Sequence, residues 1–499
     1  MAKFENKKVL ILERKSHLGG YTNEVRKQGS YIWEAGIQAV GQIEENSINR
    51  LIFNFITNDS LGWTRLPDVY SRLVYPDFIF EIEKGEENFR KDLIIMFPQE
   101  EEKISAYFRD VKIAAKWFNR NRAITTAPLN KKRTQISTDS IEKIALSTLA
   151  EYLDANFINP KLKALLASNW IACGLLPSEA AFAIHAATLN HYFEGAYYPL
   201  GGSKEISETM ILPVIQKGGM VLTNHSVGEI IVENGKAVGV KSNEIRIGEK
   251  IQRNYYSDII ISNIGARQTF SKLIPEFIDE QTKKEISEFT EEPVTVTLYL
   301  ALHSDPREMG FGAENIWIYK TYNHEENYRL NSQLTEGRCG ALMLSFPSLK
   351  LKNTQKHTAM IAVLGNLQDF RNWITRPHKN KEISKRALSG DISNTILDLV
   401  ESRFSGFRKM IGFQDLSLPI NLDTGEYIGG NIFGFPAIPK KFKVKWLHPE
   451  TPLQNFYITG SDISGHGVVG GMLSGVVTLN SIMNVPISVF RVFRDSKQK

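Results

Sequence analysis

Short apolar runs followed by polar or small residues mark two predicted strands of a parallel sheet. Residues 9–12 form one such run, with Glu13 directly after it, and residues 259–261 form a second that leads into a loop of small residues. A continuous apolar run of this length is typical of a strand buried on both faces. Because parallel sheets of this kind bind ligands at the carboxyl ends of their strands, Glu13 is a candidate binding residue.

The chain between residues 100 and 195 is predicted to be mainly helical. Residues 138–157 are the clearest case, because Asp139 suits an N-cap, Glu142 follows three residues later, and apolar residues recur at helical spacing. We interpret this region as a helical subdomain inserted into the fold. Its apolar face is expected to pack into a hydrophobic core. The alternative is that this face lines a tunnel that binds lipid.

The pattern changes to short β-rich runs from residue 218 onward. Residues 218–243 predict a β-meander, in which Asn234-Gly235 has the signature of a type I′ hairpin turn. Residues 293–303 alternate apolar and polar positions, which predicts a half-buried antiparallel strand of a second sheet. Residues 455–483 predict a strand, a glycine-rich turn and a helix. The chain is therefore expected to have an α/β fold.

Composition narrows the functional classes. The 499 residues carry a net charge of +5, which is too weak by itself to indicate nucleic-acid binding. With two cysteines and no His-x-x-x-His spacing, neither a disulfide framework nor metal catalysis is expected. We found no run of about 18 apolar residues that would span a membrane and no signal peptide. The expected location is the cytoplasm, with peripheral membrane attachment as the alternative.

Several motifs in fixed order resemble one family of flavoenzymes. They are the acidic strand end at Glu13, the helical insertion, Tyr198-Pro199 with Gly201-Gly202, the meander, the loop after residue 261, and a late "TGSD" followed by "GHGVVGG". Along its whole length the chain resembles the family of phytoene desaturases, carotenoid isomerases and retinol saturases. The resemblance implies a glutathione-reductase-type FAD-binding domain, with a parallel sheet and a β-meander, interleaved with an α+β substrate domain that contains the helical insertion.

The resemblance also implies a set of cofactor-binding residues. Glu13 would bind the adenosine ribose, Val227 would contact the adenine through its backbone, and Asp462 would bind the ribityl chain. Unpaired amides at a helix N-terminus can face the electron-rich edge of a reduced flavin, which suits the glycines that open the last helix. The remaining implied cofactor-binding residues are Lys15, Gly19, Gly20, Gly467, Gly470 and Gly471.

The same resemblance divides the chain into five segments. The FAD-binding domain would comprise residues 1–70, 197–290 and 446–499, and the substrate domain would comprise residues 71–196, with the helical insertion, and 291–445, with the second sheet.

One departure from the family pattern lies at the N-terminus. A GxGxxG loop that ends the first strand is expected about 20 residues before the acid, yet only twelve residues precede Glu13. We therefore expect the family's first strand, its glycine loop and the start of its first helix to be missing, through a misplaced start codon or gene decay. Residues 1–7 would be the tail of that helix.

A second departure lies in the segment expected close to the flavin. Many retinol-saturase-like proteins have a Gly-apolar-His-Tyr motif there, whereas this chain has Gly36, Ile37, Gln38 and Ala39. A histidine can transfer a proton near neutral pH and a glutamine cannot. Gln38 would instead orient substrate or hydrogen-bond the flavin. The absence of the histidine counts against retinoid reduction as the reaction.

These features predict an FAD-dependent oxidoreductase that exchanges a hydride with C=C or CH–CH bonds of a lipophilic substrate, isoprenoid or carotenoid-like in chemistry. Because the flavin performs the difficult step, no catalytic residue stands out. The alternatives are an amine-oxidase-like flavoenzyme, which shares the fold, and a truncated remnant without activity. Two basic segments, residues 119–133 and 485–499, are candidates for docking on a membrane surface.

The missing glycine loop generates a prediction about flavin content. A chain extended upstream to restore the loop is expected to purify with flavin absorption bands that the 499-residue chain lacks, because the loop cradles the pyrophosphate. Absorption spectra of the two proteins, purified side by side, measure this. Bands in both proteins would show that the loop is not needed for retention, and bands in neither would favour the remnant.

Overall fold

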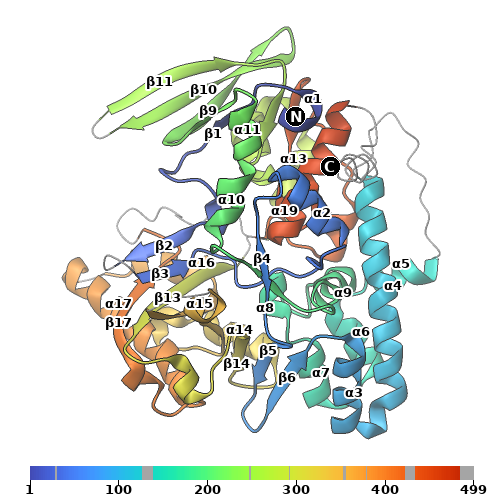
Figure 1. Cartoon of the computed structure of the whole chain (residues 1–499), viewed down its shortest axis with the longest axis vertical. Helices are drawn as coiled ribbons and strands as arrows, with labels where there is room; N and C mark the ends of the chain where they lie inside the picture. The colour runs from blue at the N-terminus through green and yellow to red at the C-terminus, as the bar shows by residue number, and fades with distance from the viewer. Residues whose placement is uncertain are drawn as a thin grey trace.

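The computed structural model describes residues 1–27, 31–125, 139–246, 249–290, 293–351, 356–377, 379–421 and 433–483. Figure 1 shows three parts: a seven-stranded sheet with helix α17 (Lys381–Glu401), a group of helices on the opposite side, and a β-meander at the far end of the molecule. Of the two basic docking segments expected from the sequence, residues 485–499 lie outside the described residues, and of residues 119–133 only residues 119–125, at the end of α4 (Glu101–Thr125), are described.

The seven-stranded sheet combines two distant stretches of the chain. Its strand order is β17-β13-β16-β15-β14-β5-β6, with the pair β14 and β5 parallel and the other pairs antiparallel. The expected domain boundary at residue 70 falls inside β5. The strands are β5 (Val69–Val74), β6 (Ile79–Glu83), β13 (Val294–Leu302), β14 (Asn315–Tyr319), β15 (Ala341–Ser345), β16 (His357–Gly365) and β17 (Ile411–Ser417).

Strand β13 is the antiparallel strand that the sequence predicts, but it is buried on both faces. Val296, Leu298 and Leu300 pack in one core with residues of α17, whereas Tyr299 packs on the other side with Trp33. Trp33 belongs to the hairpin of β2 (Glu24–Lys27) and β3 (Tyr31–Glu34), and its indole donates a hydrogen bond to the carbonyl of Leu300 at 3.0 Å. The prediction of a half-buried strand is wrong because this distant hairpin covers the second face.

The helical group lies between β6 and β7 (Tyr197–Pro199) in the chain, as expected. The prediction of one helix over residues 138–157 is wrong, because α5 ends at Ala145 and α6 begins after Thr148. Thr148 and Glu151 form a reciprocal capping box there, which starts a separate helix. The helices are α3 (Glu86–Met96), α4 (Glu101–Thr125), α5 (Asp139–Ala145), α6 (Leu149–Asn156), α7 (Pro160–Leu166), α8 (Trp170–Cys173) and α9 (Phe182–His191).

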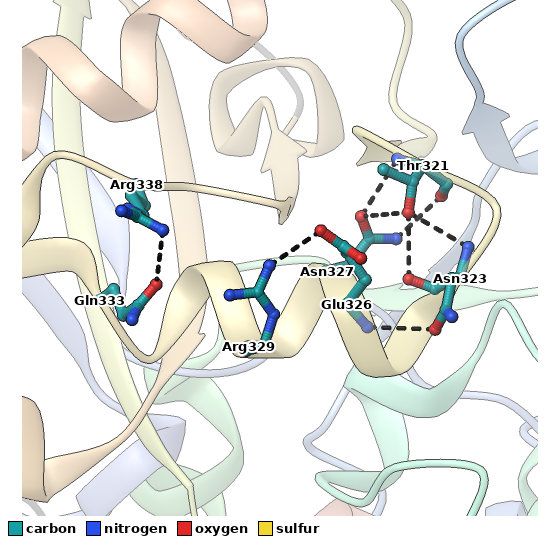
Figure 2. A network of polar contacts seen from close by, with 7 residues as sticks. All are labelled: Thr321, Asn323, Glu326, Asn327, Arg329, Gln333 and Arg338. Carbon is teal, nitrogen blue, oxygen red and sulfur yellow. Dashed lines mark hydrogen bonds and ion pairs between the residues drawn. The ribbon is translucent and has the colours of Figure 1, made fainter.

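Helix α14 (His324–Asn331) joins the helical group to the sheet. Figure 2 shows its N-terminus, where the Asn323 side chain accepts from the amide of Glu326 and Asn327 bonds both main-chain groups of Thr321. His324, the first residue of the helix, accepts from the indole of Trp170 at 3.1 Å and donates to the carbonyl of Ala164 at 2.9 Å. The imidazole therefore bridges two helices of the group in its neutral form.

The predicted parallel strands are present as two separate pairs. Strand β1 (Leu10–Leu12) pairs with β8 (Met220–Leu222), and β12 (Ile260–Ser262) pairs with β18 (Phe456–Ile458). The prediction that β1 and β12 are fully buried is wrong: all three residues of β1 are half-buried, and Ile261 is 41% exposed. Each strand has one hydrogen-bonded neighbour in the described part of the chain, so an edge and part of its faces are uncovered.

The meander and the C-terminal helix agree with their predictions. Strands β9 (His225–Glu233), β10 (Lys236–Arg246) and β11 (Glu249–Tyr256) form an antiparallel sheet. Asn234 and Gly235 have φ of 49° and 76°, as a type I′ turn requires. Helix α19 (Gly467–Met483) follows β18, and α1 is the helical turn expected near the N-terminus. The other helices and strands are α1 (Ala2–Glu5), α2 (Ile48–Ile56), β4 (Trp63–Arg65), α10 (Lys204–Met210), α11 (Leu212–Gln216), α12 (Ala266–Gln268), α13 (Glu280–Ser287), α15 (Pro347–Lys350), α16 (Leu367–Thr375) and α18 (Ser461–Ser464).

The buried imidazole of His324 makes stability pH-dependent. Burial lowers its pKa to about 4, against about 6.5 in the unfolded chain. Between these values the unfolded state binds more protons, so as the pH falls from 6.5 to 4 this residue removes up to about 3 kcal/mol of unfolding free energy. A His324→Gln variant can accept from Trp170 and donate to Ala164 without titrating.

Thermal unfolding at pH 7 and at pH 4.5 tests this expectation. The wild-type midpoint should fall by more than the midpoint of His324→Gln over that interval. Equal falls in the two proteins would contradict a contribution from His324, since the other buried histidines are common to both.

Candidate active site

The predicted adenosine-binding residues lie together at the carboxyl end of β1. The amide of His225 donates to the carbonyl of Glu13 at 2.8 Å, which places the start of β9, and with it Val227, beside the end of β1. The Glu13 carboxylate accepts from the amide of Lys15 at 2.7 Å and is partly accessible, while the side chain of Lys15 is exposed. The carboxylate thus retains acceptor sites for a ligand's hydroxyl groups.

Gly19 and Gly20 form the tight turn that follows β1. Their φ values are 98° and 55°, both in the left-handed region. A Cβ on Gly19 would lie 2.8 Å from the hydroxyl oxygen of Ser207 in α10, whereas a Cβ on Gly20 would meet nothing within 4 Å. A side chain at position 19 would therefore disturb the packing against α10, whereas the backbone of Gly20 has free space beside it.

The loop that contains Gln38, residues 36–42, starts directly after the β2–β3 hairpin. Glu34, the last residue of β3, is buried and accepts a hydrogen bond from the hydroxyl of Ser203, next to α10. Burial raises the pKa of the Glu34 carboxyl, and the hydrogen bond from Ser203 offsets part of this rise. The hydroxyl of Tyr198 faces the same carboxylate without a well-aligned partner among the described residues. A polar cluster thus holds the start of the loop.

Lys350, at the end of α15, holds the loop itself. Its ammonium group donates to the carbonyl of Gln38 at 2.7 Å, to Asn315 Oδ1 at 2.8 Å and to Ser345 Oγ at 2.7 Å. The Gln38 amide lies between Lys350 and the sulfur of Met360, so its side chain points toward the sheet. Burial lowers the pKa of Lys350 to about 7, although the nearby Glu34 and Glu314 favour its charged form.

A histidine fixes the other end of the loop. His191, the last residue of α9, accepts a hydrogen bond from the amide of Gly41 at 2.9 Å through Nε2. Burial lowers the pKa of His191 to about 4, with a further lowering by the neighbouring His466. His191 therefore holds this end of the loop against the end of α9.

Asp462, the predicted ribityl-binding acid, is 3% exposed and already has two partners. One carboxylate oxygen accepts from the amide of Ala266 at 2.7 Å, and the other accepts from the amide of Phe435 at 2.5 Å. Asp462 thus ties the loop after β12 to the segment that leads into β18. Each carboxylate oxygen has a second lone pair for a ligand hydroxyl.

The glycines that open α19 differ in their surroundings. A Cβ on Gly470 would overlap the carbonyl oxygen of Gly465, whereas Gly467 and Gly471 have open space where a Cβ would be. Gly465, Gly467 and Gly470 have the spacing G-x-G-x-x-G, the one place where it occurs in the sequence, here at the last helix instead of after the first strand. The close turn leaves the first amides of α19 accessible to a ligand.

A cavity of about 270 Å³ lies where the helical group meets this C-terminal segment. Asp462 and His466 line it from one side, and Phe118, Trp170 and Ile184 line it from the helical group. Val469 and Met472 of α19 belong to the same hydrophobic core as Ile37 and Val40 of the loop. The helix start, the loop and the cavity are therefore parts of one packed unit.

These residues fit an FAD molecule at several points. Glu13 and Val227 suit the adenosine end, and Asp462 with the amides at Gly467–Gly471 suits the flavin end. The open backbone at Gly20, Gly467 and Gly471 leaves room for a ligand to approach. The structure does not bring the side chain of Gln38 into the cavity.

Three further residues of the site were not predicted from the sequence. Lys350 lies in an ordinary alternating stretch, and His191 lies at the end of a helix, so neither had a sequence signal. His466 stands inside the glycine motif "GHGVVGG", where a polar ring among glycines and valines was the available clue.

The packing of α19 generates a prediction with a matched control. In protein supplied with FAD, Gly470→Ala should push the helix start away from Gly465 and reduce flavin retention by tenfold or more, because the Cβ would overlap main-chain atoms. Gly475→Ala lies in the same helix at an exposed position with open space, so it should retain flavin and gain about 0.5–1 kcal/mol of stability. Flavin absorbance per chain after gel filtration measures retention, and equal values for the two variants would contradict the role of Gly470.

Comparisons with known proteins show that the chain is similar to flavin-dependent enzymes. The family model for flavin containing amine oxidoreductases matches residues 3–248. The all-trans-retinol 13,14-reductase of Danio rerio is 27% identical, over 96% of this chain and 82% of the relative. The chloroplastic prolycopene isomerase of Arabidopsis thaliana is 23% identical, over 95% of this chain and 78% of the relative.

A solved structure supports the fold. An oxidoreductase from Methanosarcina mazei superimposes with a TM-score of 0.60 at 15% identity, covering 96% of this chain and 94% of the other. The expected α/β fold with an FAD-binding domain is thereby confirmed. By these likenesses the chain is an FAD-dependent oxidoreductase that is similar to the retinol 13,14-reductases and the prolycopene isomerases.

Proposed function

We propose that this flavoenzyme acts on C=C or CH–CH bonds of a lipophilic, isoprenoid substrate. The observation that carries the proposal is the cavity of about 270 Å³, whose walls are mostly aromatic and aliphatic and which reaches Asp462 and the start of α19. A cavity of this kind binds hydrocarbon chains by burying apolar surface, at roughly 0.8 kcal/mol for each CH₂ group. The relatives named for retinol and for prolycopene have substrates of this chemistry in their names.

The protein residues would bind the cofactor, orient the substrate and exclude water. When bound, FAD supplies hydride transfer. We assign the adenosine end to Glu13 and Val227, with Lys15, Gly19 and Gly20 along the dinucleotide, and the ribityl chain to Asp462. Gly467, Gly470 and Gly471 would place helix amides at the flavin, where a helix N-terminus stabilises negative charge. With these roles, residues 1–70, 197–290 and 446–499 would form the FAD-binding domain, and residues 71–196 and 291–445 would form the substrate domain.

The loop with Gln38 would act mainly by its shape. Lys350 fixes the middle of the loop and His191 fixes its far end, so the loop would act through a fixed shape instead of as a mobile acid or base. The Gln38 amide cannot transfer a proton. The proposed reaction is a desaturation, a saturation or an isomerisation of the substrate.

Two other functions compete with this proposal. An amine-oxidase-like activity is favoured by the matching family model, since its description names amine oxidoreductases. A chain without activity is the second alternative.

Membrane contact is a further part of the proposal. Within the described residues, no helix is both long and apolar enough to cross a bilayer. A substrate extracted from a membrane would require surface contact, for which residues 119–133 and 485–499 are the basic candidates. Equal recovery with neutral and anionic liposomes in a flotation assay would argue against docking.

A reduction and reoxidation assay tests the proposed function. The purified yellow protein is reduced anaerobically with dithionite, and all-trans-retinol or prolycopene is added in detergent. We expect one of these lipids to reoxidise the flavin or to be isomerised, as measured by absorbance and chromatography of the lipid. Flavin reduction of the oxidised protein by benzylamine or putrescine, with no response to lipids, would instead indicate an amine oxidase, and a colourless protein would indicate a remnant.

A further inference from the structure

We propose that His466 is a specificity-determining residue, which hydrogen-bonds a single hydroxyl group on the otherwise apolar ligand of the cavity. This inference rests on the proposed function and narrows its substrate class to isoprenoid alcohols over pure hydrocarbons.

Somewhat more than half of the cavity surface is apolar. Phe118, Trp170, Leu175, Ile184, Phe433 and Phe442 contribute to it from both the helical group and the C-terminal segment. Such walls favour a hydrocarbon chain and offer it no polar partner.

Most polar side chains of the lining are already bonded or lie at the mouth. Both carboxylate oxygens of Asp462 accept from main-chain amides, and Lys441 donates to the carbonyl of Phe435 at 2.7 Å. Glu179 and Asn366 are exposed, so they face water at the entrance. Lys441, Glu179 and Asn366 therefore do not supply a buried hydrogen bond to a lipid inside the cavity, and the remaining acceptor sites of Asp462 are assigned to the ribityl chain of the cofactor.

His466 differs from them in having no hydrogen bond. Among the described residues, neither ring nitrogen has a hydrogen-bonding partner, and the ring packs edge-on against Phe433 at 5.7 Å between centroids. Burial lowers the pKa of His466 to about 4, with a further lowering by Lys441. His466 is half-buried and lines the cavity.

A neutral imidazole suits a hydroxyl group on chemical grounds. One ring nitrogen donates and the other accepts, and an alcohol can satisfy either. A hydrocarbon in the same place would cover the ring and leave a buried polar group unpaired, which is unfavourable. One hydrogen bond to His466 would therefore make the cavity bind an alcohol about tenfold more tightly than the corresponding hydrocarbon.

Energy transfer from tryptophan to ligand provides a binding assay that needs no turnover. Trp170 lines the cavity, so its emission should be quenched by a bound polyene. The probes are all-trans-retinol and the corresponding hydrocarbon that lacks its hydroxyl, titrated into the protein as purified. We expect the wild type to bind retinol about tenfold more tightly than the hydrocarbon.

Three variants isolate the role of His466. His466→Phe should abolish the preference by weakening retinol binding, whereas His466→Gln, which can still donate and accept, should retain most of it. Phe118→Leu is the matched control in the cavity wall and should weaken both probes alike, without changing their ratio. Thermal unfolding of each variant beside the wild type confirms that it is folded.

The outcomes separate this inference from the proposed function. Equal binding of both probes by the wild type, or an unchanged preference in His466→Phe, would overturn the role of His466 and leave a lipophilic substrate standing. Failure of both probes to bind would overturn the inference as well as the proposed function.

Discussion

One buried ammonium group, that of Lys350, holds the loop of the active site against the seven-stranded sheet. Removing a charge from water is costly, and this cost is what lowers the pKa of Lys350. The charge is tolerated because three oxygens, from Gln38, Asn315 and Ser345, accept its three protons. Two of these partners belong to strands β14 and β15, so the loop cannot shift without leaving the ammonium group unpaired. The position of the loop is therefore set by electrostatics as much as by packing.

Apolar packing extends this constraint to the rest of the molecule. Trp33 covers one face of the sheet and is followed by Glu34 and the loop, so the hairpin links sheet packing to loop placement. Helix α19 contributes Val469 to the core around the loop and Val477 to the core around β18. Because one helix lies in both cores, the segment that begins at Asp462 is held between the helical group and the parallel strands. The cavity lies at that junction.

The sequence predicted the elements whose signals are local and missed those that depend on distant partners. The turn at Asn234-Gly235, the meander and the final strand and helix follow from nearby residues, and all are confirmed. The burial of β13 was underestimated because the hairpin that covers it lies more than 250 residues away in the chain. The break before Thr148 was missed because apolar spacing continues through it while the side-chain cap competes with the helix. Lys350, His191 and His466 became recognisable only when the fold placed them beside the loop and the cavity.

The two separate pairs of parallel strands have a consequence for the behaviour of the protein in solution. Strands β1 and β12 each have one hydrogen-bonded neighbour in the described residues, and Met220 and Ile261 of these pairs are 56% and 41% exposed. An unpaired edge of apolar residues can accept a strand from another molecule. Concentrated samples should therefore self-associate through these strands, and charged substitutions along the edges offer a way to improve their solubility.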